Sequence, residues 1–171
     1  MQKGFQMTIL YAPSFREDFD LLHANCLCTY DLQILEILYT QKCGGGGHNK
    51  ILYLPHSKTP TKYNKVILEA LDYCSITQIS NLQKAKEAEI LITDTSNLAL
   101  AFSLSFLKPS LLYLPAFTTV DFGNDRLYAA LQKIAFVTTS LKELKATLNA
   151  LEFTKDSKLK EITEFLQGDL L

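Results

Sequence analysis

Short apolar runs alternate with longer segments of mixed polarity along most of the chain. The runs cover residues 7–12, 50–54, 75–79, 89–93, 110–114 and 134–137. Several of them end at a proline or a small polar residue, which is typical of buried strands that lead into loops. The segments between them carry apolar residues at helical spacing, and we predict helices over residues 30–39, 63–71, 82–88, 96–107 and 126–132.

The C-terminal part of the chain has the pattern of helices only. Ser140 and Glu143 form a capping-box pattern ahead of leucines at helical spacing, so a helix is expected to begin there and to extend to about Leu151. A last amphipathic helix is predicted over residues 157–166. Both helices are expected to cover the core.

Continuous apolar strands separated by helix-sized segments indicate a sheet that is covered on both faces. Right-handed parallel crossovers are the usual way to connect such strands. The sequence therefore predicts an α/β fold, a three-layer Rossmann-like domain with a mainly parallel sheet of about six strands. We find no internal repeat and no shift in composition, so we expect a single domain over residues 1–171.

Composition narrows the class of protein. Hydrophobic residues make up 47% of the chain and charged residues 20%, which is ordinary for a globular protein. The net charge of −1 provides no general field for nucleic acid or acidic membranes, so any anion site must be local. Lys108 and Pro109 interrupt the longest apolar stretch, and the pieces are shorter than the roughly 20 residues of a membrane-spanning helix.

The four cysteines are expected to be reduced thiols in the cytoplasm, because the chain starts without the pattern of a secretory signal. Cys26, Cys28, Cys43 and His48 lack the spacing of a zinc site, and we expect no metal. The glycines at 44–47 lack the residues that follow a phosphate-binding loop. They favour the end of a helix and a flexible connection over a phosphate cradle.

Polar residues follow three of the predicted strands. Ligands of open parallel sheets gather outside the carboxyl ends of the strands, so these residues are the candidates for a site. The candidate nucleotide- and phosphate-binding residues are Ser14, Arg16, His56, Thr95, Ser96 and Asn97. No residue is identified as catalytic.

Each candidate has a functional and a purely structural interpretation. Thr95, Ser96 and Asn97 precede an apolar helix, whose N-terminal N–H groups can bind a phosphate or simply be capped. His56 can donate to a phosphate oxygen, although a lone histidine is more often a surface residue. The guanidinium of Arg16 suits phosphate, although a loop arginine is usually only solvated.

Three segments together resemble the C-terminal half of CDP-glycerol glycerophosphotransferase-like enzymes, which have the two-domain GT-B fold. Residues 8–18 read TILYAPSFRED, similar to the family's ILYAPTFR. Residues 88–102 read AEILITDTSNLALAF, similar to its A-D-x-L-I-T-D-Y-S-S-x-x-F-D-F segment. Residues 108–114 read KPSLLYL, similar to the family's KPIIFY strand.

The resemblance implies that this half binds the CDP part of an activated donor, with Ser96 and His56 near the diphosphate and Arg16 as a weaker candidate. It implies no cofactor, because the nucleotide-activated donor, CDP-glycerol or a nucleotide sugar, is a substrate. The sequence departs from the family in three places. Thr95, Ser96 and Asn97 stand for Y-S-S, Ala101 replaces an acidic residue, and Pro55-His56 replaces His-Pro.

We therefore expect the donor-nucleotide-binding domain of a glycerophosphotransferase- or glycosyltransferase-like enzyme of cell-surface polymer or glycan synthesis, such as teichoic-acid-like polymers. The acceptor half is absent, so activity is expected to need an N-terminal domain or a partner chain. The expected partners include a nucleotide-type small molecule and no nucleic acid, with at most peripheral association at the inner face of the membrane. The alternative is a non-catalytic binding module that kept the fold. A sugar-nucleotide epimerase half has less support, because no acidic residue adjoins a glycine-rich turn after the fourth strand.

Overall fold

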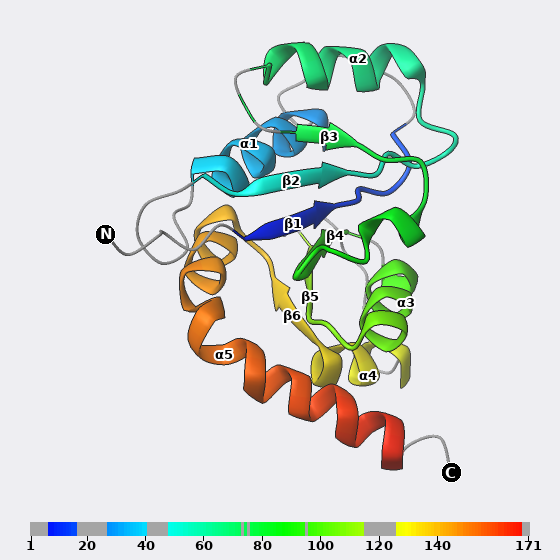
Figure 1. Cartoon of the computed structure of the whole chain (residues 1–171), viewed down its shortest axis with the longest axis vertical. Coiled ribbons are helices and arrows are strands. Elements are labelled where there is room, and N and C mark those ends of the chain that lie inside the picture. Colours follow the sequence, from blue (N-terminus) through cyan, green and yellow to red (C-terminus); the bar gives the residue numbers. More distant parts are fainter. Residues whose placement is uncertain are drawn as a thin grey trace. The chain divides into compact units, whose positions relative to one another are not determined.

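The computed structural model describes residues 7–16, 27–40, 48–72, 74, 76–94, 96–114 and 126–168, with only the backbone at 27–29, 96, 126–129 and 152. The chain divides between Ala88 and Glu89 into two compact units. Figure 1 labels the helices and strands and colours them along the sequence. Strands and helices alternate in both units.

The described part of the first unit contains three parallel strands. They are β1 (Thr8–Tyr11), β2 (Lys50–Tyr53) and β3 (Ile76–Gln78). β2 pairs with both others, and the register aligns Tyr11 with Tyr53 and Tyr53 with Gln78 at the carboxyl ends. The helices of this unit are α1 (Leu27–Thr40), α2 (Thr61–Ala70) and the short 3₁₀ helix η1 (Leu82–Ala85).

The core of the first unit comes from both strands and helices. In β1 and β2 the side chains of Ile9, Leu10, Ile51 and Leu52 are buried, which requires cover on both faces of the strands. On α1, Ile34, Leu35 and Leu38 recur at helical spacing and are also buried.

The second unit repeats this plan. Its parallel strands are β4 (Ile90–Thr93), β5 (Ser110–Tyr113) and β6 (Ala135–Thr138), with β5 in the middle. Its helices are α3 (Ser96–Phe106), α4 (Arg126–Ile134) and α5 (Leu141–Gly168). Ala99, Leu112 and Leu131 form a buried cluster that joins α3, β5 and α4.

A buried polar contact fixes α3 on β5. The Ser110 hydroxyl donates to the carbonyl oxygen of Ala99 at 2.9 Å, and its oxygen lies 2.6 Å from the hydroxyl of Ser103. Because the Ser110 proton is used on Ala99, the Ser103 hydroxyl must donate to Ser110. Both serines are therefore satisfied within the core.

The predicted three-layer Rossmann-like α/β fold, with six strands in parallel pairings, is confirmed. The predicted helix over 82–88 is shorter, a 3₁₀ turn that begins where the Asn81 side chain accepts from the N–H of Lys84. The predicted helix over 96–107 ends one residue earlier, because Leu107 adopts a positive φ of 53° and Pro109 follows. Ile134, predicted to start the last strand, is the last residue of α4.

The prediction of two C-terminal helices is wrong, because α5 is one helix of 28 residues. The polar residues between the predicted helices include neither glycine nor proline, so nothing in that segment ends a helix. Thr154 and Ser157 donate back to the carbonyl oxygens of Ala150 and Thr154, contacts that often accompany a bend. Figure 1 shows α5 changing direction along its length. The capping box is confirmed: the N–H of Glu143 donates to Ser140 Oγ at 3.2 Å.

Lys158 connects α5 to the end of α4. Its ammonium donates to the carbonyl oxygens of Lys133 at 3.2 Å and Gln132 at 3.5 Å, both in the last turn of α4. It also pairs with Glu161 at 2.6 Å and lies 5.2 Å from the centre of the Phe136 ring. This cation caps α4 from a neighbouring helix.

Candidate functional site

A buried ion pair lies behind the carboxyl ends of the strands in the first unit. Asp31 on α1 is 1% exposed and Arg16, in the loop after β1, is 7% exposed. The guanidinium donates to the carboxylate twice, from Nε to Oδ2 at 2.9 Å and from Nη2 to Oδ1 at 2.8 Å. This bidentate geometry is the strongest form of an arginine–carboxylate contact.

Two tyrosines complete the surroundings of the carboxylate. The hydroxyl of Tyr11 donates to Oδ1 of Asp31, and the hydroxyl of Tyr63 donates to Oδ2. Each carboxylate oxygen therefore accepts from one guanidinium nitrogen and one hydroxyl. The cluster joins β1, the loop after it, α1 and α2, and we refer to Tyr11, Arg16, Asp31 and Tyr63 as the Asp31 cluster.

The tyrosines at this position hold their protons firmly. Burial, followed by the negative charge of Asp31, raises the pKa of both Tyr53 and Tyr63 well above the ordinary value of 10. Tyr53 donates to Oδ1 of Asn64 at 3.0 Å and stacks on Tyr11, with ring centres 6.2 Å apart. Both hydroxyls consequently act as hydrogen-bond donors and not as bases near neutral pH.

The ion pair also fixes the loops that follow β1 and β2. Nη1 of Arg16 donates to Oγ of Ser14 at 2.8 Å, so two of the predicted site residues are in direct contact. The backbone N–H of Arg16 donates to Oγ1 of Thr59, a buried residue after β2, at 3.3 Å. Arg16 therefore stabilises the loop after β1 through its side chain and links this loop to the one after β2 through its backbone.

Phe15 and His56 form the exposed part of these strand ends. Phe15, between two anchored residues, is 37% exposed. Its ring centre lies 5.7 Å from that of His56, with the planes tilted by 51°. The N–H of Lys58 donates to Nδ1 of the exposed His56 at 3.2 Å, which requires the proton of a neutral imidazole to be on Nε2. Nε2 can therefore donate to an anionic oxygen.

The remaining predicted site residues belong to the second unit. β4 ends at Thr93 and α3 begins at Ser96, so the backbone of Ser96 lies at a helix N-terminus as predicted. Only the backbone of Ser96 is described. Thr95 is outside the described residues and Asn97 is exposed. Ala101, at the position where the resembled family has an acid, is exposed on the same helix. The binding roles of these residues stay predictions.

Sequence reasoning missed Asp31, Thr59 and Tyr63. The helix predicted over residues 30–39 would place Asp31 at its start, where an acid is ordinary. The helix α1 begins at Leu27, so Asp31 lies in its second turn and is buried. The signal was present: Asp31 shares a helical face with Leu35 and Leu38, and an acid on an apolar face needs a buried cation. Sequence periodicity does not identify which positively charged residue pairs with Asp31.

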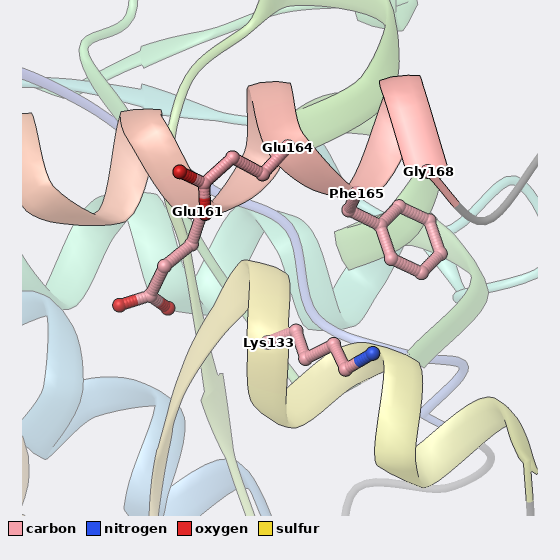
Figure 2. Close-up of a pocket in the computed structure, with 5 residues that line it drawn as sticks. All are labelled: Lys133, Glu161, Glu164, Phe165 and Gly168. Carbon is pink, nitrogen blue, oxygen red and sulfur yellow. The ribbon is translucent and has the colours of Figure 1, made fainter.

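Neither of two cavities among the described residues is lined by a predicted site residue that the structure describes. The first, of about 360 Å³, lies between α4 and α5 in the second unit. Figure 2 shows Lys133 on α4 opposite Glu161, Glu164 and Phe165 on α5. The second, of about 450 Å³, lies beside α2 in the first unit and is lined by residues such as Lys65 and Leu68. Their mixed charge and open position indicate no particular ligand.

The described residues contain no group of histidine, cysteine and acidic side chains placed to hold a metal ion. Cys26, Cys43 and the glycines at 44–47 lie outside the described part, as does the side chain of Cys28. Cys74 is a buried free thiol. The His48 ring stacks on Tyr39, with centres 4.4 Å apart. Among the helices described, none combines the length and apolar character needed to cross a bilayer.

Comparison with known proteins yields likeness in structure only. No family model matches the chain, and no curated protein matches it. A structure of the wall teichoic acid polymerase TagF with CDPG is similar with a TM-score of 0.58 and 18% identity, over 95% of this chain and 36% of TagF. TarM is similar with a TM-score of 0.52 and 12% identity, over 96% of this chain and 33% of TarM. At these identities the likeness shows a fold of the kind found in these proteins, and this chain spans about a third of each.

Proposed function

We propose that this chain is the donor-nucleotide-binding part of a glycerophosphotransferase- or glycosyltransferase-like enzyme of cell-surface polymer or glycan synthesis. The observation that carries the proposal is the likeness to TagF over 95% of this chain and 36% of that protein. The TILYAPSFR, LITD and KP segments point to the same family from the sequence. The whole chain would then correspond to one half of a two-domain transferase.

In this proposal the ligand is an activated donor such as CDP-glycerol or a nucleotide sugar. The Nε2–H group of His56 and the hydroxyl of Ser14 would donate to the diphosphate from the first unit. Within the second unit, the backbone N–H groups that begin α3, with Ser96, Thr95 and Asn97, are the candidate phosphate-binding groups. No cofactor is required, because the donor carries its own leaving group.

The reaction would need a second protein part. This chain offers donor-binding groups, while a group that deprotonates the acceptor would come from an N-terminal acceptor domain or a partner chain. Binding and transfer are therefore separable. The chain alone should bind CDP-glycerol and should not transfer glycerol phosphate until the acceptor half is supplied.

Isothermal titration calorimetry with CDP-glycerol, CDP and UDP tests the proposal. We expect saturable binding of at least one nucleotide, lost in the double variant His56→Ala and Ser96→Ala and kept in the control His48→Ala. His48 is a suitable control because its ring stacks on Tyr39 away from the strand ends. Absence of binding at millimolar ligand would refute the proposal.

The exposed Ala101 favours one alternative, a binding module that has kept the fold without transferase activity. The resembled family carries an acid at this position, and an alanine there removes a carboxylate from α3. Restoring it with Ala101→Asp distinguishes the two. Tighter binding of CDP-glycerol by the variant would support the transferase. If neither the parent nor the variant binds a nucleotide, the result would support the binding module.

A further inference from the structure

The guanidinium of Arg16 has the wrong surroundings for a ligand contact. Its side chain is 6% exposed, that of Asp31 is 2% exposed, and the two are joined bidentately. A phosphate would have to displace a carboxylate that also accepts from Tyr11 and Tyr63. Breaking a buried ion pair leaves an uncompensated charge, which is strongly unfavourable.

We infer that Asp31 and Arg16 are positioning residues: the pair holds the loop that presents Ser14 and Phe15 at the strand ends, and Arg16 does not contact the ligand. The inference rests on the proposed function, since it names how that site is held. It reassigns Arg16, which the sequence alone placed among the phosphate-binding residues.

The contacts show how the pair acts. Nη1 of Arg16 holds Ser14 by its hydroxyl, and the backbone of Arg16 is anchored on Thr59. Phe15 lies between these two fixed points, so its ring is turned outward and placed beside His56. Pre-organisation of this kind lowers the cost of ligand binding because the loop is ordered beforehand.

The variant Asp31→Asn distinguishes a positioning role of Arg16 from a direct phosphate contact, because the two roles predict different changes in CDP affinity. The amide keeps the shape and one acceptor oxygen but loses the charge that holds the guanidinium. If the pair positions the loop, the affinity for CDP should fall about tenfold, which corresponds to about 1.4 kcal/mol. If Arg16 binds phosphate directly, its release from Asp31 should leave CDP binding unchanged or tighter, and the inference is overturned.

A second variant covers the case in which Asp31→Asn does not fold. Arg16→Lys keeps the positive charge but cannot hold Asp31 and Ser14 together. We expect a similar loss of CDP affinity with an unchanged dependence of Kd on salt, because no direct phosphate contact is removed. Retained affinity would contradict the inference. Glu69→Gln, an exposed residue of α2 paired with Lys65, is the control and should bind as the parent does.

A measurement without ligand separates failure of the inference from failure of the proposed function. The ring signals of His56 and Phe15 in NMR spectra should shift in Asp31→Asn and Arg16→Lys but not in Glu69→Gln. Unshifted signals would overturn the positioning role even if the parent binds CDP. If they shift but the parent binds no nucleotide, the proposed function fails while the loop is still held by the pair.

Discussion

Lys158→Met should destabilise the second unit by removing the cation that caps α4. The side chain of Lys158 is 11% exposed, so its contacts are largely shielded from water. A hydrogen bond to a charged group contributes about 1.5–3 kcal/mol to the free energy of unfolding. Only the bond to Lys133 at 3.2 Å is counted, because the contact to Gln132 at 3.5 Å is at the long limit for a hydrogen bond. The pair with the half-exposed Glu161 adds less than about 1 kcal/mol. Methionine keeps most of the aliphatic stem.

The expected loss is therefore about 2 kcal/mol in the free energy of unfolding. Urea denaturation followed by circular dichroism measures it, and for a chain of this length the melting temperature should fall by about 4–8 °C. Lys160→Met is the matched control on the same helix, since Lys160 is 75% exposed and lies 3.7 Å from Glu164. It should change stability by less than about 0.5 kcal/mol. Equal effects of the two substitutions would refute the assignment of Lys158 as a cap.

Three further predictions concern the core, the tyrosines and the start of α5. Ser110→Ala should destabilise the protein by about 1–2 kcal/mol in urea denaturation, more than Ser103→Ala, because only Ser110 takes part in both hydrogen bonds of the pair; equal losses would contradict this hydrogen-bond order. Because the pKa values of Tyr53 and Tyr63 are raised, the free energy of unfolding should decline as pH rises above about 10. In that range tyrosines of the unfolded chain ionise, while these two keep their protons in the folded protein. Replacing both with phenylalanine should make the decline with pH less steep. Hydrogen bonds from Thr139 lower the pKa of Glu143, so the start of α5 should lose hydrogen-exchange protection as pH falls through and below the ordinary glutamate range, and Glu143→Ala should remove this dependence.

Hydrophobic patterning predicted the helices and strands whose burial is evident from their own local sequence. β4 and β5 are fully buried, and their continuous apolar runs were sufficient to place them. The junction within α5 was misjudged because a polar segment on a long surface helix has the same pattern as a loop. Only the absence of glycine and proline distinguished the two.

The candidate site was predictable only in part. Residues at strand ends could be identified because parallel strands all end at the same edge of a sheet. The partner of Arg16 could not, since Asp31 reaches it from a helix and the contact depends on tertiary packing. Exposure could not be predicted either: both interpretations of Arg16, phosphate binding and simple solvation, require an accessible side chain, but Arg16 is buried and Phe15 beside it is exposed.

Mapping of CDP-glycerol onto the protein by NMR is the most direct test of a donor site at the strand ends. The account predicts saturable shifts of the ring signals of His56 in the first unit and of the amide signals of Ser96 and Asn97 in the second unit as ligand is added. Shifts confined to other surfaces, such as the cavity between Lys133 and Phe165, would contradict it.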